Sequence, residues 1–194
     1  MNLGKLFMLQ SELDAHIEQQ HPREKGESRH GKKVLALLVE LGELANEARF
    51  FKFWSRDQKP RKLVEYDVCT RCDGLGIYSD EDCDVENCFD GELVKNPLLE
   101  EYVDGIHFLL SIGLENNIEE LKIKPIKKET LTEQFIGLYN VFTILHIHFS
   151  PEVYSEAWSA YIGLAEMLGF TWDEIEKAYL AKNQKNHDRQ DGGY

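Results

Sequence analysis

The sequence has no long run of apolar residues. No segment approaches the roughly 20 consecutive apolar residues that a membrane-spanning helix needs, so we expect no transmembrane segment. The first ten residues, MNLGKLFMLQ, lack a basic region followed by an apolar stretch and a small-residue cleavage site, so no secretory signal is expected either. We therefore expect a cytoplasmic protein.

Basic residues are outnumbered. The 194 residues include 22 Lys and Arg against 35 Asp and Glu, which gives a formal net charge of −13. A general nucleic-acid surface needs clustered Lys and Arg to replace the counterions around phosphates, so we expect no such partner. Acidity does not exclude an anionic ligand, because carboxylates can hold a divalent cation that in turn holds phosphate. The positions of the carboxylates are therefore more informative than their number.

Alternation typical of strands is also scarce, and helical periodicity dominates. Apolar residues recur every three or four positions in a first segment that ends before His21, in a second from Val34 to Ala48, and in a third from about Leu98 to Leu114. These patterns predict three helices.

Start signals predict three more helices. Thr130 with Glu133 and Thr171 with Glu174 have the spacing of capping boxes, and Ser150 stands before a proline. The length suits one domain. We therefore expect a single all-α domain over residues 1–194, built as a bundle of five or six helices.

All four cysteines lie in one segment, residues 66–96, between the second and third predicted helices. Cys69 and Cys72 form a Cys-x-x-Cys pair, and Cys83 and Cys88 follow after ten residues. Four thiolates complete a tetrahedral structural zinc site, which leaves no open position for catalysis. The alternative is a set of reduced, unliganded thiols. We expect a Cys-rich insert that holds a structural Zn²⁺.

Two pairs of carboxylates suggest chemistry. Glu40, Glu43 and Glu47 fall within about 60° of one another on the second helix, and Glu101 and Asp104 repeat the three-residue spacing on the third. Like charges at this spacing destabilise a helix, and partial burial raises that cost. Facing pairs would supply hard oxygen ligands for Mg²⁺ or Mn²⁺, whereas solvated helix faces would need no metal.

These carboxylates belong to motifs that resemble those of the all-α dimeric dUTPases, within the all-α nucleoside-triphosphate pyrophosphatase superfamily. The similar stretches are LQSELD (9–14), ELGELANE (40–47), FKFW (51–54), EEYVDGIHF (100–108) and YLAKNQKNHDRQDGGY (179–194). The resemblance covers nearly the whole chain except the cysteine insert.

The resemblance implies Mg²⁺-dependent hydrolysis of dUTP to dUMP and pyrophosphate, which keeps uracil out of DNA. By that analogy Glu40, Glu43, Glu101 and Asp104 ligate two or three Mg²⁺ ions, and Glu43 is also the general base. It also implies a homodimer and a substrate-closing arm at residues 183–194.

Recognition residues also carry over from the resemblance. Lys182 and Arg189 match phosphate contacts, and Phe108 is placed against the sugar, where it excludes a 2′-hydroxyl. The remaining matches surround the sugar and base: Gln10, Trp54, Asn186 and Tyr194. Structural alternatives are that Trp54 belongs to the core and that Lys182 complements a helix C-terminus.

Three other functions remain open. One is a pyrophosphatase for a different nucleotide, and a second is a non-enzymatic interaction module that docks through the cysteine insert. The third, a di-iron bundle, requires a second Glu-x-x-His pair on another bundle helix. One further pair, Glu27 and His30, lies in a charged loop beside Gly31, so we expect His107 to be a packing residue.

Overall fold

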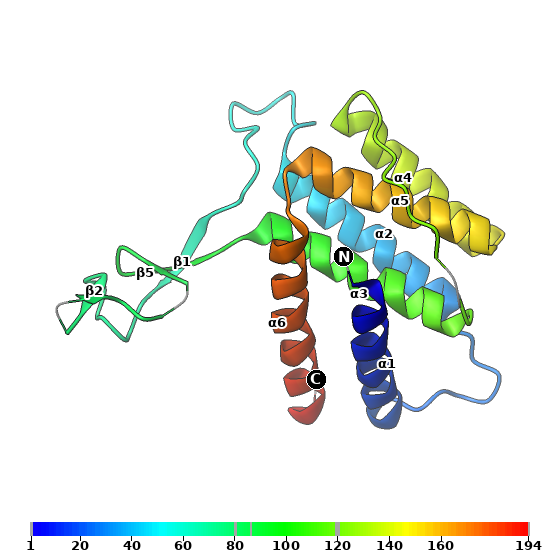
Figure 1. Cartoon of the computed structure of the whole chain (residues 1–194), viewed down its shortest axis with the longest axis horizontal. Coiled ribbons are helices and arrows are strands. Elements are labelled where there is room, and N and C mark those ends of the chain that lie inside the picture. The colour runs from blue at the N-terminus through cyan, green and yellow to red at the C-terminus, as the bar shows by residue number, and fades with distance from the viewer. Residues whose placement is uncertain (1, 80, 86, 119–120, 194) are drawn as a thin grey trace.

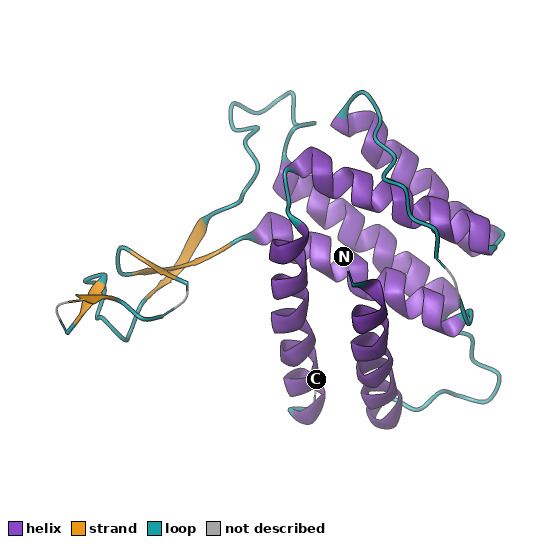
Figure 2. Cartoon of the chain, in the orientation of Figure 1, coloured by secondary structure: helices purple, strands orange, loops and turns teal. Residues whose placement is uncertain are grey.

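Six helices and five short strands make up the described part of the chain. The computed structural model describes residues 2–79, 81–85, 87–118 and 121–193. The helices form one body, and the strands form a projection that leaves it between α2 and α3 (Figure 1). Colouring by secondary structure separates the two parts clearly (Figure 2). The predicted helical bundle is therefore confirmed.

The helices are α1 (Leu3–Gln20), α2 (His30–Ala48), α3 (Pro97–Glu115), α4 (Leu131–Ile147), α5 (Pro151–Leu168) and α6 (Trp172–Asp191). The strands are β1 (Val64–Val68), β2 (Ile77–Tyr78), β3 (Glu81–Asp82), β4 (Cys88–Phe89) and β5 (Glu92–Lys95). Among the described residues, no helix is long and apolar enough to cross a membrane.

The predicted start signals are confirmed. Thr130 and Thr171 each accept a hydrogen bond from the backbone N–H of the glutamate three residues on, and that glutamate bonds back to the cap. The Ser150 side chain caps α5 ahead of Pro151. Gly169 ends α5 in the left-handed conformation, with φ 80°, which glycine adopts without strain.

The strands are the part of the fold that helical periodicity does not predict. β5 pairs antiparallel with both β1 and β4, and β2 pairs with β3. These strands have two to five residues, and most of their side chains are exposed. They therefore carry no apolar alternation that would mark them in the sequence.

The end of the chain differs from the predicted arm. Residues 183–191 continue α6 as a helix to Asp191, and Asn183 is buried. Gln184 Nε2 donates to Asp188 Oδ1 at 2.8 Å, and His187 stacks on His16 of α1 with ring centroids 5.1 Å apart. These contacts hold the polar segment in the helix beside α1. The last residue, Tyr194, lies outside the described residues.

Helix α3 is the centre of the bundle, and two tyrosines of α5 bond directly to its backbone. Tyr161 donates to the Tyr102 carbonyl at 2.8 Å, Tyr102 donates back to the Tyr161 carbonyl at 3.1 Å, and the two rings stack. Tyr154 donates to the Leu109 carbonyl at 2.7 Å. The tyrosine hydroxyls reach α3 because it carries glycine at positions 105 and 113, where a Cβ would lie 2.1 and 2.2 Å from them.

Gly113→Ala tests this close approach. Its methyl group would collide with the Tyr154 hydroxyl, so we expect the free energy of unfolding to fall by about 1–3 kcal/mol in urea denaturation. Gly137→Ala in α4 is the matched control, because the nearest atom to its Cβ is the end of a lysine side chain at 3.8 Å. That change should stabilise the protein by up to about 1 kcal/mol, since alanine favours helix. Equal effects of both changes would contradict the packing described.

Candidate active site

Three carboxylates from two neighbouring helices meet in one cluster. Glu40 projects from α2, and Glu101 and Asp104 project from α3, where a spacing of three residues puts them on one face. One oxygen from each lies within 4.8 Å of the others, and all three side chains are partly buried. The two carboxylate pairs were predicted to face each other across the helices, and these three residues do so.

The carboxylates of this cluster repel one another. Burial and the charges of Asp104 and Glu43 raise the pKa of Glu40 to about 7. Burial and the charges of Asp104, Glu43 and Glu40 raise the pKa of Glu101 to about 7 as well. Burial also raises the pKa of Asp104, against the opposing effect of Lys182. Such a set of hard oxygen ligands suits a divalent cation, which would relieve this repulsion.

Glu43 stands apart from the other predicted ligands. Its side chain is exposed, and it is not one of the three residues whose oxygens converge within 4.8 Å. It is nevertheless close enough for its charge to act on both Glu40 and Glu101. The structure therefore places Glu43 at the edge of the cluster, on its solvent side.

Lys182 joins α6 to the cluster. Its Nζ lies 2.5 Å from Asp104 Oδ2, and both side chains are largely shielded from solvent. Lys182 is in the middle of α6, ten residues after the helix begins, so it does not merely complement a helix C-terminus.

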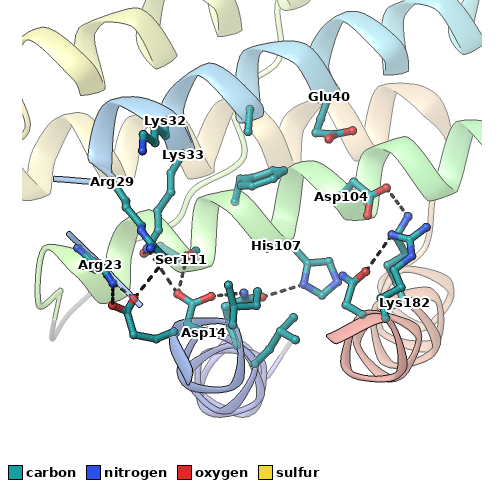
Figure 3. Close-up of a pocket in the computed structure, with 18 residues that line it drawn as sticks. Asp14, Arg23, Arg29, Lys32, Lys33, Glu40, Asp104, His107, Ser111 and Lys182 are labelled. Atoms are coloured by element: carbon teal, nitrogen blue, oxygen red, sulfur yellow. Dashed lines mark hydrogen bonds and ion pairs between the residues drawn. The ribbon is translucent and has the colours of Figure 1, made fainter. Parts of the chain in front are cut away.

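A cavity of about 550 Å³ opens beside the cluster, between α1, α2, α3 and α6. Figure 3 shows Glu40, Asp104 and Lys182 at one end and Arg23, Arg29, Lys32 and Lys33 at the other, with His107 between them. Five of the predicted recognition residues line the cavity: Gln10, Phe108, Lys182, Asn186 and Arg189.

The basic end of the cavity was not predicted from the sequence. Its residues lie in the charged loop before α2 and in the first turn of that helix. Most are paired with acids: Lys33 Nζ lies 2.9 Å from Glu115, and Arg23 bonds both Glu18 and Glu115. The available signal was the density of Lys and Arg between residues 23 and 33 in a chain that is otherwise acidic.

Gln10 is held rigidly in the cavity wall. Its Oε1 accepts from His107 Nδ1 at 2.8 Å and from the Tyr179 hydroxyl at 3.0 Å, and its Nε2 donates to Asp14 at 2.7 Å. The His107 ring stacks on Tyr179, and its burial lowers its pKa to about 3, so the ring is neutral. His107 is thus a packing and orienting residue, which agrees with the prediction.

Two predicted recognition residues are not placed in the cavity. Trp54 follows α2 in a loop, is 66% exposed, and contacts Phe51 and Phe53 rather than any residue lining the cavity. It is therefore not a core residue either. Tyr194 lies outside the described residues.

A second possible metal-binding group lies in the projection. The sulfur atoms of Cys69, Cys72, Cys83 and Cys88 all lie within 4.8 Å of one another. The structure therefore brings together all four cysteines of the predicted zinc group.

The fold and this geometry define a helical protein with an acidic cluster at the end of a cavity whose other charged groups are mainly basic. The family model described as dUTPase matches residues 2–67 and 90–194, so the chain belongs to the all-α dUTPase family. Membership supports a dUTPase-type activity on a nucleotide, in a family that generally needs a divalent metal. No curated protein matches the chain. The unmatched residues, 68–89, contain all four cysteines.

The cluster predicts a stability that depends on pH in the absence of metal. Glu40 and Glu101 titrate near pH 7 when folded against 4.5 ordinarily, so the folded state binds more protons between these values and loses stability as pH rises. His107 acts oppositely, since its pKa is lowered, but its effect on the slope fades as pH rises above its ordinary value of 6.5. In EDTA we therefore expect the free energy of unfolding to fall between pH 6.5 and 8.

Urea denaturation at several pH values measures this slope. Glu101→Gln removes one titrating group and should flatten it, whereas Glu100→Gln, which alters an exposed neighbour, should leave it nearly unchanged. A stability that rises across the same interval in the unmodified chain would contradict the assigned direction.

Proposed function

We propose that the protein hydrolyses dUTP to dUMP and pyrophosphate with the help of Mg²⁺. The observation that carries this proposal is the meeting of Glu40, Glu101 and Asp104 at the end of a cavity that also contains Lys182 and Arg189. A triphosphate needs both kinds of group: cations for its oxygens, and carboxylates to hold the metal ions.

Glu40, Glu101 and Asp104 would hold the Mg²⁺ ions, and Glu43 would complete the set from its exposed edge. Their partial burial and raised pKa values fit groups whose charge is balanced by bound cations. When bound, Mg²⁺ neutralises phosphate oxygens, lowers the pKa of a coordinated water and stabilises charge on the leaving group. The cysteine group takes no part, because four thiolates around one ion leave no open position.

The chain's own residues supply the remaining steps. Glu43, exposed beside the cluster, would accept the proton of the water that attacks the α-phosphorus. The bond between the α-phosphorus and the bridging oxygen then breaks, and pyrophosphate leaves. Lys182 would exchange its carboxylate partner, Asp104, for a phosphate oxygen, and Arg189 would bind a second phosphate oxygen with its planar fork.

The other end of the substrate would occupy the cavity near α1. The Gln10 oxygen is fixed by bonds from His107 and Tyr179, and one N–H of its amide donates to Asp14, which leaves the other N–H for a base carbonyl. Asn186 lines the same space, and Phe108 would pack on the deoxyribose and exclude a 2′-hydroxyl. Trp54 would reach the uracil through a movement of its loop or from a second subunit, and Tyr194 is proposed to lie beside the sugar and base.

A panel of dUTP, dTTP, dCTP and UTP tests the activity. With Mg²⁺ we expect dUMP and pyrophosphate from dUTP, little turnover of the other three, and none in EDTA. Glu101→Gln should lower kcat by about 100-fold or more, the scale of losing one charge-stabilising group. Glu100→Gln is the matched control and should retain near-normal kcat, because this side chain is exposed and outside the cluster.

The outcomes separate the proposals. Equal turnover of the whole panel would keep the metal site and overturn the uracil and sugar assignments. No turnover of any nucleotide by the folded protein would overturn the enzymatic proposal and favour an interaction module.

We also propose that the protein is a homodimer formed through the outer face of α2 and α4. These helices pack on each other, and both expose large apolar side chains. The face consists of Leu35 and Val39 on α2 with Ile136, Tyr139 and Ile147 on α4. Several large exposed apolar residues on two packed helices are typical of an interface.

Leu35→Asp tests the dimer. Leu35 is 63% exposed, so the change should preserve the fold while placing a charge on each side of the contact. We expect sedimentation velocity to give a dimer for the unmodified chain and a monomer for the variant. Leu75→Asp is the control, because Leu75 is 75% exposed on the projection and should leave the dimer intact. A monomeric unmodified chain at micromolar concentration would contradict the proposal.

A further inference from the structure

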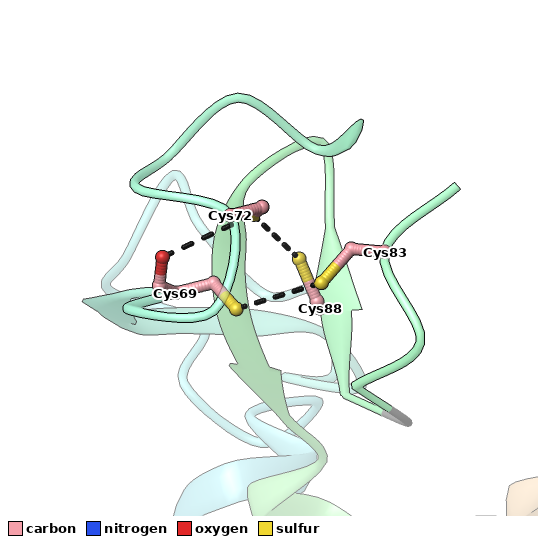
Figure 4. A group of neighbouring side chains, drawn as sticks. All are labelled: Cys69, Cys72, Cys83 and Cys88. Atoms are coloured by element: carbon pink, nitrogen blue, oxygen red, sulfur yellow. Dashed lines mark hydrogen bonds between the residues drawn. The ribbon is translucent and has the colours of Figure 1, made fainter. Parts of the chain in front are cut away.

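The four cysteines form a compact group at the heart of the projection. Cys69 Sγ lies 3.8 Å from Cys83 Sγ, and Cys72 Sγ lies 3.7 Å from Cys88 Sγ. Figure 4 shows the four side chains converging, with Cys69 and Cys72 on one turn of the chain and Cys88 at the start of β4. The chain contains four cysteines in total, so none lies elsewhere.

These separations match a tetrahedral metal site. Zinc binds thiolate sulfur at about 2.3 Å, and the edge of a tetrahedron with that radius is about 3.8 Å. A disulfide requires sulfur atoms about 2.05 Å apart, so the observed spacing does not correspond to two bridges. The sulfur atoms therefore lie where a zinc ion would need them.

Two similar turns follow the second cysteine of each pair. Asp73-Gly74 follows Cys72, and Asp90-Gly91 follows Cys88 after one residue, and all four residues have positive φ. The turns touch, because a Cβ on Gly91 would lie 2.2 Å from the Gly74 carbonyl oxygen. The two glycines thus allow the backbone to fold tightly enough to bring both cysteine pairs together.

The projection has no hydrophobic core that could hold this shape. Among its described residues, Cys69 and Cys72 are the only buried side chains of any size, and the larger apolar residues such as Leu75, Ile77 and Phe89 are exposed. A unit of about 30 residues with so little burial needs a metal or a cross-link to stay folded. Free thiols would provide neither.

We propose that Cys69, Cys72, Cys83 and Cys88 bind one structural Zn²⁺ ion, which replaces a hydrophobic core in the projection. Each thiol loses its proton to solvent on binding, and the ion has no open position for substrate. The proposal is independent of the proposed dUTP hydrolysis, because the site lies in residues 68–89, outside the family match.

Elemental analysis of the full-length protein, purified without chelator, tests the proposal. We expect one zinc per chain, together with thiols that react slowly with Ellman's reagent until a strong chelator is added. After that addition, four thiols per chain should react. Replacement of zinc by Co²⁺ should give the intense charge-transfer bands of thiolate-bound cobalt, which carboxylates do not produce.

Variants locate the ion. Cys83→Ser should lose the zinc and the cobalt bands, whereas Thr70→Ser, an exposed position in the same turn, should keep both. Glu101→Gln should also keep the zinc, which distinguishes this site from the acidic cluster. Circular dichroism should show that the helical body remains folded in each variant.

Three results would overturn the proposal. These are a folded, metal-free protein with four freely reactive thiols, a protein with two disulfides, and a protein that binds iron instead of zinc. A zinc content that falls with Glu101→Gln but not with Cys83→Ser would equally reject the cysteine site.

Discussion

The packing of α2 against α3 forces three carboxylates closer together than like charges tolerate without a counterion. The three side chains, Glu40, Glu101 and Asp104, cannot move apart while the apolar faces of their helices stay buried. Burial and mutual repulsion therefore raise the pKa values of Glu40 and Glu101 to about 7. The hydrophobic core thus supplies the free energy that holds the repelling groups in place. Tyr154 and Tyr161 of α5 also fix α3 through bonds to its backbone. The acidic cluster is therefore preorganised for cations by the packing of the helices, with Lys182 as an internal counterion.

Much of the helical body could be predicted because its signals are local. Capping boxes at Thr130 and Thr171 and the apolar stripe of α2 each depend on residues within one or two turns. The facing of Glu40 with Glu101 and Asp104 followed from two such stripes that pack together. The strands could not be predicted, because their folding depends on pairing between β1 and β5, which brings residues from opposite ends of the projection together. The helical end of α6 could not be predicted for a related reason, because its polar residues are held by contacts with α1 and not by an apolar stripe.

For the site, too, local sequence signals were not enough to predict which residues come together. Gln10, Phe108, Lys182, Asn186 and Arg189 were predicted and line one cavity, although they come from α1, α3 and α6. Their convergence required the family resemblance, since no periodicity relates residues so far apart in the sequence. The resemblance did not point to the basic residues of the cavity, Arg23, Arg29, Lys32 and Lys33. They line the cavity because the loop before α2 folds back against Glu18 and Glu115. Trp54 remains outside the cavity, so its predicted role needs a movement or a second subunit.

The two candidate metal-binding groups differ in chemistry, which keeps them independent. The acidic cluster offers hard oxygen atoms at the edge of an open cavity, a setting for an exchangeable ion such as Mg²⁺. The cysteine group offers soft sulfur atoms in a closed shell and suits an ion that does not exchange. The antiparallel ribbon of β1 and β5 connects the two, and it enters α3 through the Asn96 cap, five residues before Glu101 begins the acidic pair. Asn96 caps α3, the Leu98 N–H bonds the Arg61 carbonyl at 3.2 Å, and the Arg61 N–H bonds the Glu47 carbonyl of α2 at 3.0 Å. Because these bonds tie the start of α3 to α2, we expect the acidic cluster to keep its geometry whether or not the projection holds an ion.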